Sequence, residues 1–203
     1  YKANRSGMPG ELAAQMPYLK ELLSAMNINC FELENYEADD IIGTVSKNCE
    51  KENIECYILT GDRDDLQLAS EKTRIMLVTT RAGKTGTDIY DDKAVFEKYG
   101  LTPYEFIHLK GLMGDSSDNI PGVAGVGEVT ATKLLKEFST IDKVYENIDS
   151  KTISKGVREK LLKDKEMAFL SLQLATINRD TPVKWELSEN IRKEPDNERL
   201  LSL

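Results

Sequence analysis

The chain changes its hydrophobic pattern near residue 90, and this change limits the folds that it can adopt. Before that point, helical patterns alternate with strand-like runs. We expect helices over 11–27, with a kink or boundary at Pro17, and over 36–53. We expect strands over 30–33, 55–60, 73–80 and 87–90, the last closing a hairpin. From residue 91 onward the apolar spacing is helical only. We therefore expect an α/β fold, with a mainly parallel sheet flanked by helices and an all-helical C-terminal half.

Composition excludes several classes of protein. The 203 residues suffice for one sizeable core, and 40% apolar and 31% charged residues are typical of a globular chain. No apolar run approaches the roughly 20 residues of a membrane span. Three cysteines without a CxxC pair favour a reducing cytoplasm over a disulfide framework. Because the first residue is Tyr1, we expect a piece of a longer polypeptide.

Three groups of carboxylates lie at predicted strand or helix edges: Glu37, Asp39 and Asp40 at the start of the helix over 36–53, Asp62 and Asp64 just past the run 55–60, and Asp115 and Asp118 in the segment GDSSDN. Ligands bind at the carboxyl ends of strands in such sheets, and residues three apart share a helical face. An acidic helix start is also an ordinary solvated cap, and GDRDD also suits a plain turn. Both interpretations stay open at this point.

Oxygen ligands without histidine or cysteine favour a hard cation, Mg²⁺ or Mn²⁺, over zinc. Seven carboxylates exceed the need of one magnesium ion and suit two ions about 3.5–4 Å apart, which activate a water and stabilise charge on a scissile phosphate. Such a cluster would explain part of the net charge of −8, while its ions attract phosphate.

The segment IPGVAGVGEVTATKLLKEF places Gly122, Gly125 and Gly127 just before a helical pattern. Glycines let the backbone approach a ligand closely, and amides at a helix N-terminus bind anions. With helices on both sides, the segment predicts a helix-hairpin-helix that binds a DNA backbone irrespective of sequence. The valines, Val126 among them, would anchor the hairpin, and Lys133 would reach a phosphate. A glycine-rich turn without a ligand is the alternative.

The opening residues YKANRSG place Lys2 and Arg5 three apart beside Tyr1. A basic pair with an aromatic side chain suits phosphate contact and base stacking, and an ordinary solvated terminus is the alternative. His108, the only histidine, lies among apolar residues, so we expect it in the core.

The segments YKANR, YEADDIIGT, LTGDRDDLQL and GLMGDSSDNIPGVAGVGEVTATKLL occur in this order. Together they resemble the 5′ nuclease domain of bacterial DNA polymerase I, a relative of the flap endonucleases, over most of residues 1–186. The resemblance implies a nuclease core over 1–110, a helix-hairpin-helix region over 111–186, and a linker toward the rest of the polymerase over 187–203.

That resemblance also implies a structure-specific hydrolase that removes 5′ ends and flaps, RNA primers included, in replication and repair. Its partners would be duplex DNA with a flap, nick or primer, and the polymerase domains of the same polypeptide. It assigns the seven carboxylates to a site for two divalent ions, and Lys2 and Arg5 to positioning of the scissile phosphate. It assigns the glycine hairpin to the downstream duplex, with a bound potassium ion.

The family pattern includes an opening strand with an aspartate, and a second aspartate before the YKANR segment. This sequence contains neither, so the resemblance implies a sheet without its first strand and a metal site without two ligands. One alternative is therefore a duplex-binding segment without catalysis. Another is a magnesium-dependent single-strand ribonuclease, against which the hairpin counts.

Overall fold

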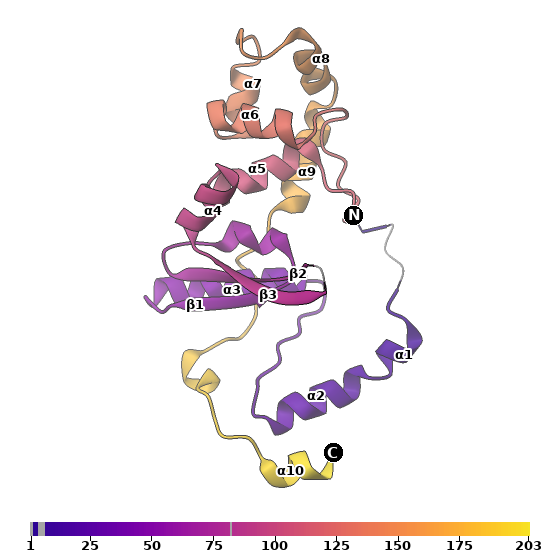
Figure 1. Cartoon of the computed structure of the whole chain (residues 1–203), viewed down its shortest axis with the longest axis vertical. Coiled ribbons are helices and arrows are strands. Elements are labelled where there is room, and N and C mark those ends of the chain that lie inside the picture. Colours follow the sequence, from indigo (N-terminus) through magenta and orange to yellow (C-terminus); the bar gives the residue numbers. More distant parts are fainter. Residues whose placement is uncertain (1, 4–6, 82) are drawn as a thin grey trace.

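The computed structural model describes residues 2–3, 7–81 and 83–203. Along the long axis of the molecule, a group of helices lies above a small sheet, and a pair of terminal helices lies below it (Figure 1). Within the described part of the chain, no helix is both long and apolar enough to cross a bilayer.

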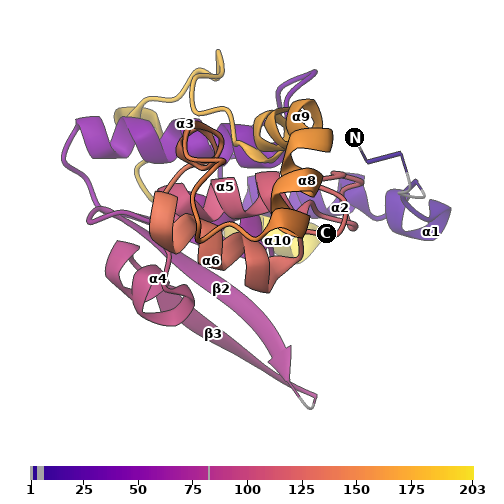
Figure 2. The same ribbon diagram turned by 90° about the horizontal axis from the view of Figure 1, so that it is seen from above.

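The sheet has the strand order β1-β2-β3, formed by β1 (Cys56–Thr60), β2 (Thr73–Arg81) and β3 (Lys84–Tyr90). β1 and β2 pair in parallel, with Cys56 opposite Thr73, and β2 and β3 pair antiparallel, with Ile75 opposite Tyr90. The β2–β3 hairpin projects from the body of the molecule (Figure 2). The predicted α/β class and the hairpin are confirmed, and the sheet combines one parallel pair with one antiparallel pair.

The strand predicted over residues 30–33 is wrong, because this segment has no regular structure and pairs with no strand among the described residues. Its apolar residue Phe31 instead lines a cavity of about 430 Å³ between α3 (Ala38–Lys51) and β1, together with Ile41, Leu59 and Trp185. The β-like composition of this segment therefore reflects the packing of a connecting loop.

One face of the sheet is buried and positions the helices above it. Ile58, Ile75, Leu77 and Tyr90 belong to the core, because alternate residues of a strand point to the same side. The core continues into α4 (Asp92–Tyr99) and α5 (Pro103–Met113). The 3-10 helix η1 (Arg63–Leu68) connects β1 to β2 and packs against α5.

Four further helices complete this half: α6 (Glu128–Phe138), α7 (Ile141–Glu146), α8 (Lys155–Lys163) and α9 (Lys165–Ala175). α6, α7 and α9 pack against α5, and α8 packs against α9. His108 of α5 is 3% exposed and its Nδ1 accepts the backbone N–H of Ile141 at 3.3 Å, which confirms its predicted place in the core. The helical pattern that runs through residues 155–175 is broken at Asp164, whose backbone leaves the helical region.

The two ends of the chain pack on each other. α2 (Met16–Ala25) follows the single turn α1 (Gly10–Ala13), and Pro17 lies in its first turn, which confirms the predicted boundary. After η2 (Leu187–Asn190), α10 (Asn197–Ser202) lies against α2, and the Asp196 N–H donates to the Ala25 carbonyl at 2.8 Å.

Candidate active site and hairpin

Carboxylates from the three groups that the sequence separates meet in one cleft of about 250 Å³. They come from the start of α3, from η1 just after β1, and from the loop after α5. Residues 173–178, at the end of α9 and beyond, form the opposite wall. The lining carboxylates are Glu37, Asp39, Asp40, Asp64 and Asp118.

The start of α3 uses some of these groups structurally. Asp40 accepts the backbone N–H of Glu37 at 3.1 Å and, from across the cleft, the backbone N–H of Asn178 at 2.8 Å. The first bond satisfies the Glu37 amide, which α3 leaves without an intrahelical partner. Asp40 therefore caps α3 and attaches the segment after α9 to it.

The other two predicted carboxylates lie beside the cleft. Asp62 is the N-cap of η1 and accepts the Asp64 N–H at 2.9 Å. Asp115 accepts the Ser117 N–H at 2.8 Å through Oδ1. Each of these two side chains thus stabilises the turn in which it lies. Asp64, which lines the cleft, interacts electrostatically with both of them.

Lys110 of α5 connects two of the carboxylate groups and was not identified from the sequence. Its ammonium is 2.6 Å from Asp115 Oδ2 and also donates to Asp64 Oδ1. Burial alone would lower the pKa of Lys110, but the hydrogen bonds that it donates to Asp115 and Asp64 outweigh burial and raise the pKa. The available signal was a lysine within the apolar helical run HLKGLM, five residues before Asp115.

The electrostatics of the cleft favour a cation. Burial raises the pKa of Asp39, and the charges of Asp62 and Asp64 raise it further. Burial also raises the pKa of Asp64. At Asp115, burial acts in the same direction, but the hydrogen bonds from Lys110 and Ser117 outweigh it and lower the pKa to about 2. Lys110 thus stabilises the charged form of Asp115, while the negative charges of Asp39, Asp62 and Asp64 repel one another.

Asp65 is a second residue that the sequence did not single out. It is 0% exposed, and within the described chain neither of its carboxylate oxygens has a hydrogen-bond partner. Burial raises its pKa to about 7, and the charges of Asp39 and Asp62 add to this effect. The only sequence signal was the doublet in GDRDD.

In the described residues, no three carboxylate, histidine or cysteine side chains converge closely enough to hold a metal ion as arranged. The lysines explain this arrangement, because Lys110 lies between Asp64 and Asp115, and Lys2 Nζ is 2.7 Å from Glu37 Oε2. The donors are nonetheless oxygen-only, partly desolvated and mutually repelling, as a hard divalent cation requires. The residues fit such an ion once it replaces the lysines as counter-charge.

Lys2 lies at the edge of the cleft, where its backbone N–H also donates to the Asp118 carbonyl at 2.8 Å. Tyr1 and Arg5, which the sequence suggested as DNA contacts, lie outside the described residues.

The loop after α5 joins the cleft to the glycine hairpin. Asp115 and Ile120 exchange two backbone hydrogen bonds of 2.8 Å, which close residues 115–120 into a ring. Gly122 passes over Gly114 so closely that a Cβ on Gly122 would lie 2.3 Å from the Gly114 nitrogen. The positions of Asp115 and Asp118 are thereby fixed relative to the hairpin.

The hairpin has the features that the sequence predicted for a helix-hairpin-helix. Val123 and Val126 are each 2% exposed and belong to the core, and Gly125 has a φ of 74°. Gly127 is the N-cap of α6, and Lys133 is exposed on that helix.

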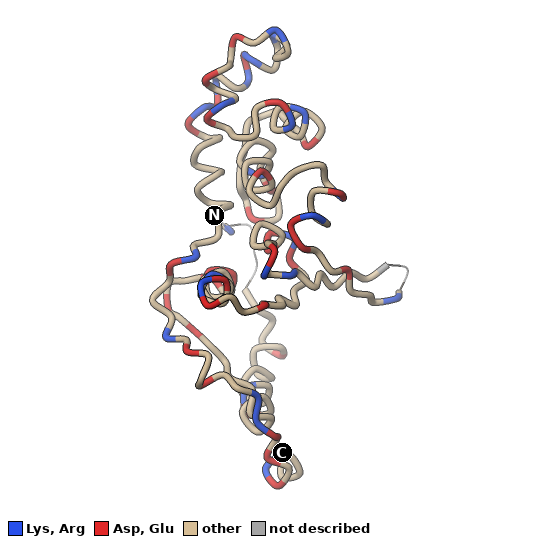
Figure 3. The backbone as a smooth tube through the Cα atoms, turned by 90° about the vertical axis from the view of Figure 1, so that its left-hand side faces the viewer, with Lys and Arg blue, Asp and Glu red and all other residues tan. Residues whose placement is uncertain are grey.

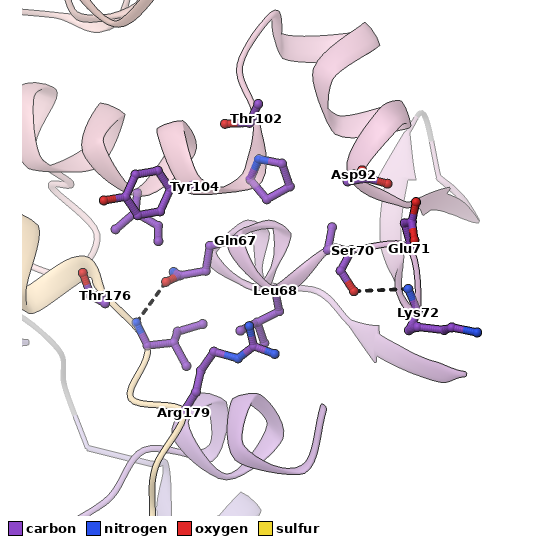
Figure 4. Close-up of a pocket in the computed structure, with 14 residues that line it drawn as sticks. Gln67, Leu68, Ser70, Glu71, Lys72, Asp92, Thr102, Tyr104, Thr176 and Arg179 are labelled. Carbon is purple, nitrogen blue, oxygen red and sulfur yellow. Dashed lines mark hydrogen bonds between the residues drawn. The ribbon is translucent and has the colours of Figure 1, made fainter. Parts of the chain in front are cut away.

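A larger cavity, of about 660 Å³, lies apart from the carboxylates between η1, the start of α5 and the segment after α9 (Figure 4). Gln67 and Arg179, two of its polar lining residues, already have partners. Gln67 binds the Ile177 N–H at 2.9 Å, and Arg179 binds Glu50 at 2.9 Å. We therefore assign it no ligand.

Two family models together match nearly the whole chain. Residues 1–100 match the N-terminal resolvase-like domain of the 5′-3′ exonucleases, and residues 101–198 match their C-terminal SAM fold.

Among curated proteins, DNA polymerase I of Bacillus subtilis (strain 168) is 50% identical over 188 residues, which are 93% of this chain and 21% of that protein. DNA polymerase I of Bacillus caldotenax is 48% identical over 203 residues, 100% of this chain and 23% of that protein. The chain thus spans about a fifth of the length of these relatives.

Among solved structures, the D15 protein of bacteriophage T5, co-crystallised with metal ions, has a TM-score of 0.70 at 25% identity. The match covers 88% of this chain and 67% of that one. The catalytic core of Rad2 in complex with a DNA substrate has a TM-score of 0.58 at 20% identity and covers 97% of this chain and 62% of that one, so it shows the fold alone.

Proposed function

This chain belongs to the 5′-3′ exonuclease family, and we propose that it is the nuclease segment of a DNA polymerase I, which hydrolyses phosphodiester bonds at 5′ ends and flaps. The observation that carries the proposal is the convergence of carboxylates from α3, η1 and the loop after α5 in one cleft. The ring of residues 115–120 connects that cleft directly to a hairpin suited to a DNA backbone.

We propose two divalent ions, Mg²⁺ or Mn²⁺, held by Glu37, Asp39, Asp40, Asp62, Asp64, Asp115 and Asp118. Such ions lower the pKa of a bound water and neutralise charge on a scissile phosphate. The relative from phage T5 crystallised with metal ions supports this choice.

The side chains of the cleft and of the hairpin have different proposed roles. Before an ion binds, Lys110 bridges Asp64 and Asp115 and stabilises the charged form of Asp115, and Lys2 at the cleft edge is placed to contact a phosphate. Tyr1 and Arg5 belong to the same proposal as further DNA contacts. The hairpin around Gly122, Gly125, Val126 and Gly127, with Lys133, holds the duplex through its backbone.

The partners are part of the proposal as well. The curated relatives are four to five times longer than this chain, which supports attachment to polymerase domains in the same polypeptide. The T5 flap endonuclease in complex with DNA and metal ions supports a DNA substrate, for which we propose a duplex with a 5′ flap, nick or RNA primer.

A second candidate function is duplex binding without catalysis. The observation that favours it is the arrangement of the carboxylates, no three of which converge on an ion among the described residues. In that case the hairpin binds DNA and the lysines neutralise the cleft permanently.

Cleavage of a 5′-labelled flapped duplex, in Mg²⁺ and in EDTA, separates the two candidates. We expect magnesium-dependent cutting near the junction by the wild-type chain. Asp115→Asn combined with Asp118→Asn should reduce the rate by at least about 100-fold, since loss of outer-shell support alone costs 10–100-fold. Duplex binding in Ca²⁺, measured by fluorescence anisotropy, should stay within about twofold.

Glu97→Gln combined with Glu52→Gln, at exposed positions of α4 and at the C-terminal end of α3, is the matched control for loss of two carboxylate charges. Duplex binding without any magnesium-dependent cutting by the wild-type chain would establish the second candidate. Equal loss of cutting and binding in the double variant would contradict the proposed division between cleft and hairpin.

A further inference from the structure

The hairpin carries a positive charge that belongs to the chain itself. Lys160 of α8 donates from Nζ to the Gly125 carbonyl at 2.9 Å. Gly125 lies at a φ of 74°, and a Cβ built there would lie 2.9 Å from the same ammonium. The Lys160 side chain therefore fills the space beside Gly125 and binds its carbonyl oxygen.

Two neighbouring contacts fix the hairpin to the same pair of helices. The Ala124 N–H donates to Asp164 Oδ2 at 3.0 Å, and the Gly122 N–H donates to the Ser171 hydroxyl at 2.9 Å. Lys160 and Asp164 are four residues apart, so they extend from the same side of the α8–α9 junction. A cation and an anion thus bind the carbonyl and the N–H of two adjacent hairpin residues.

We propose that the Lys160 ammonium is the resident cation of the hairpin, in the role for which the family resemblance implied a potassium ion. An ammonium has three N–H donors, and the Gly125 carbonyl uses one of them. Among the described residues the other two have no acceptor and can contact a phosphate, while the bond to the carbonyl holds the turn in shape. This inference rests on the proposed duplex-binding function of the hairpin.

Other lysines nearby lack this contact. In the part of the chain that the structure describes, Lys163 is the exposed last residue of α8, and its side chain makes no hydrogen bond or ion pair. Lys133 is exposed on α6, a turn beyond its first residue. Lys160 therefore differs from them by its bond to the hairpin backbone, and Lys163 serves as a control of equal charge.

Anisotropy of a labelled duplex, measured with the full chain in potassium chloride and in tetramethylammonium chloride of equal ionic strength, tests the proposal. We expect the wild-type chain and Lys163→Met to bind equally well in both salts. In tetramethylammonium, Lys160→Met should bind the duplex about tenfold more weakly than the wild-type chain, as expected for loss of one charge-assisted hydrogen bond. In potassium it should recover part of the lost affinity.

Hydrogen exchange of residues 122–127 without DNA gives a second readout. Exchange should be faster in Lys160→Met and unchanged in Lys163→Met. Identical behaviour of the two variants in both measurements would overturn this inference alone, as would potassium-dependent binding by the wild-type chain. Absence of duplex binding by the wild-type chain in either salt would overturn the proposed function together with it.

Discussion

At Gly122 the chain passes over itself with no room for a side chain. Its φ is 63°, and the atoms that a Cβ at this position would meet are backbone atoms of Gly114 and Met113 rather than flexible side chains. Gly114 itself has a φ of 74° and faces the backbone of Ile120 and Pro121. Two glycines are thus required where the carboxylate loop meets the hairpin.

Gly122→Ala should destabilise the protein by about 3 kcal/mol or more, because the substitution combines a left-handed φ with a backbone clash. Urea denaturation followed by circular dichroism measures the loss. Gly156→Ala, where a Cβ meets nothing within 4 Å, is the control and should change stability by less than about 1 kcal/mol. Equal effects of the two substitutions would refute the close crossing.

His108 makes stability depend on pH. Burial lowers its pKa below the ordinary 6.5, so below pH 6.5 the unfolded chain takes up a proton that the folded chain does not. As the pH is lowered below 6.5, the free energy of unfolding of the wild-type chain should therefore decrease relative to that of His108→Gln, by up to about 1.4 kcal/mol per pH unit. Urea denaturation at pH 5.5 and 7.5 measures this, and a constant difference between the two proteins would contradict it.

At the scale of elements, α5 positions most of the site. It packs against α6, α9 and η1, carries Lys110, and ends at the loop that holds Asp115. Its start is fixed by a capping box, in which Thr102 Oγ accepts the Glu105 N–H at 3.2 Å and Glu105 Oε2 accepts the Thr102 N–H at 2.9 Å. The stability of this helix therefore affects the cleft and the hairpin together.

Thr102→Ala should cost about 1 kcal/mol of unfolding free energy, the usual value of a lost N-cap. Ser154→Ala removes a longer cap bond of 3.4 Å at the start of α8 and should cost less. Urea denaturation compares the two variants, and the reverse order would show that α5 does not depend on its cap.

Element types followed from the sequence where periodicity was long, as in α3 and α6. The strand over 30–33 failed because apolar residues in a short segment pack equally well in a loop, as Phe31 does. The meeting of the carboxylate groups was foreseeable from their positions at element ends. The bridge formed by Lys110 and the burial of Asp65 were not, because both depend on which helix face the tertiary packing covers.

At the scale of the molecule, charge is distributed unevenly. Residues 32–71 carry 12 acidic and 3 basic side chains, whereas residues 128–165 carry 7 acidic and 9 basic ones. Basic and acidic positions alternate along the upper helices (Figure 3). The net charge of −8 therefore arises largely in residues 32–71, which include five of the seven proposed metal ligands, and residues 128–165 do not share it.

The pairing of α2 with α10 depends on both ends of the chain. Within α2, all of which the structure describes, Ala25 is the one buried residue, and a ten-residue helix without packing is marginal in water. Deletion of residues 188–203 should therefore speed hydrogen exchange over 16–25 by at least about tenfold and leave the sheet unchanged. Unchanged exchange in α2 would show that it is stable without α10.

The ring of residues 115–120 and the crossing at Gly122 also restrict how this protein can evolve. An inserted residue would open the paired backbone of Asp115 and Ile120 and change the separation of cleft and hairpin. The β2–β3 hairpin projects from the body and can accept insertions between its strands at little cost. In the proposed nuclease, the number of residues in this one loop would therefore determine the length of the DNA fragments that are released.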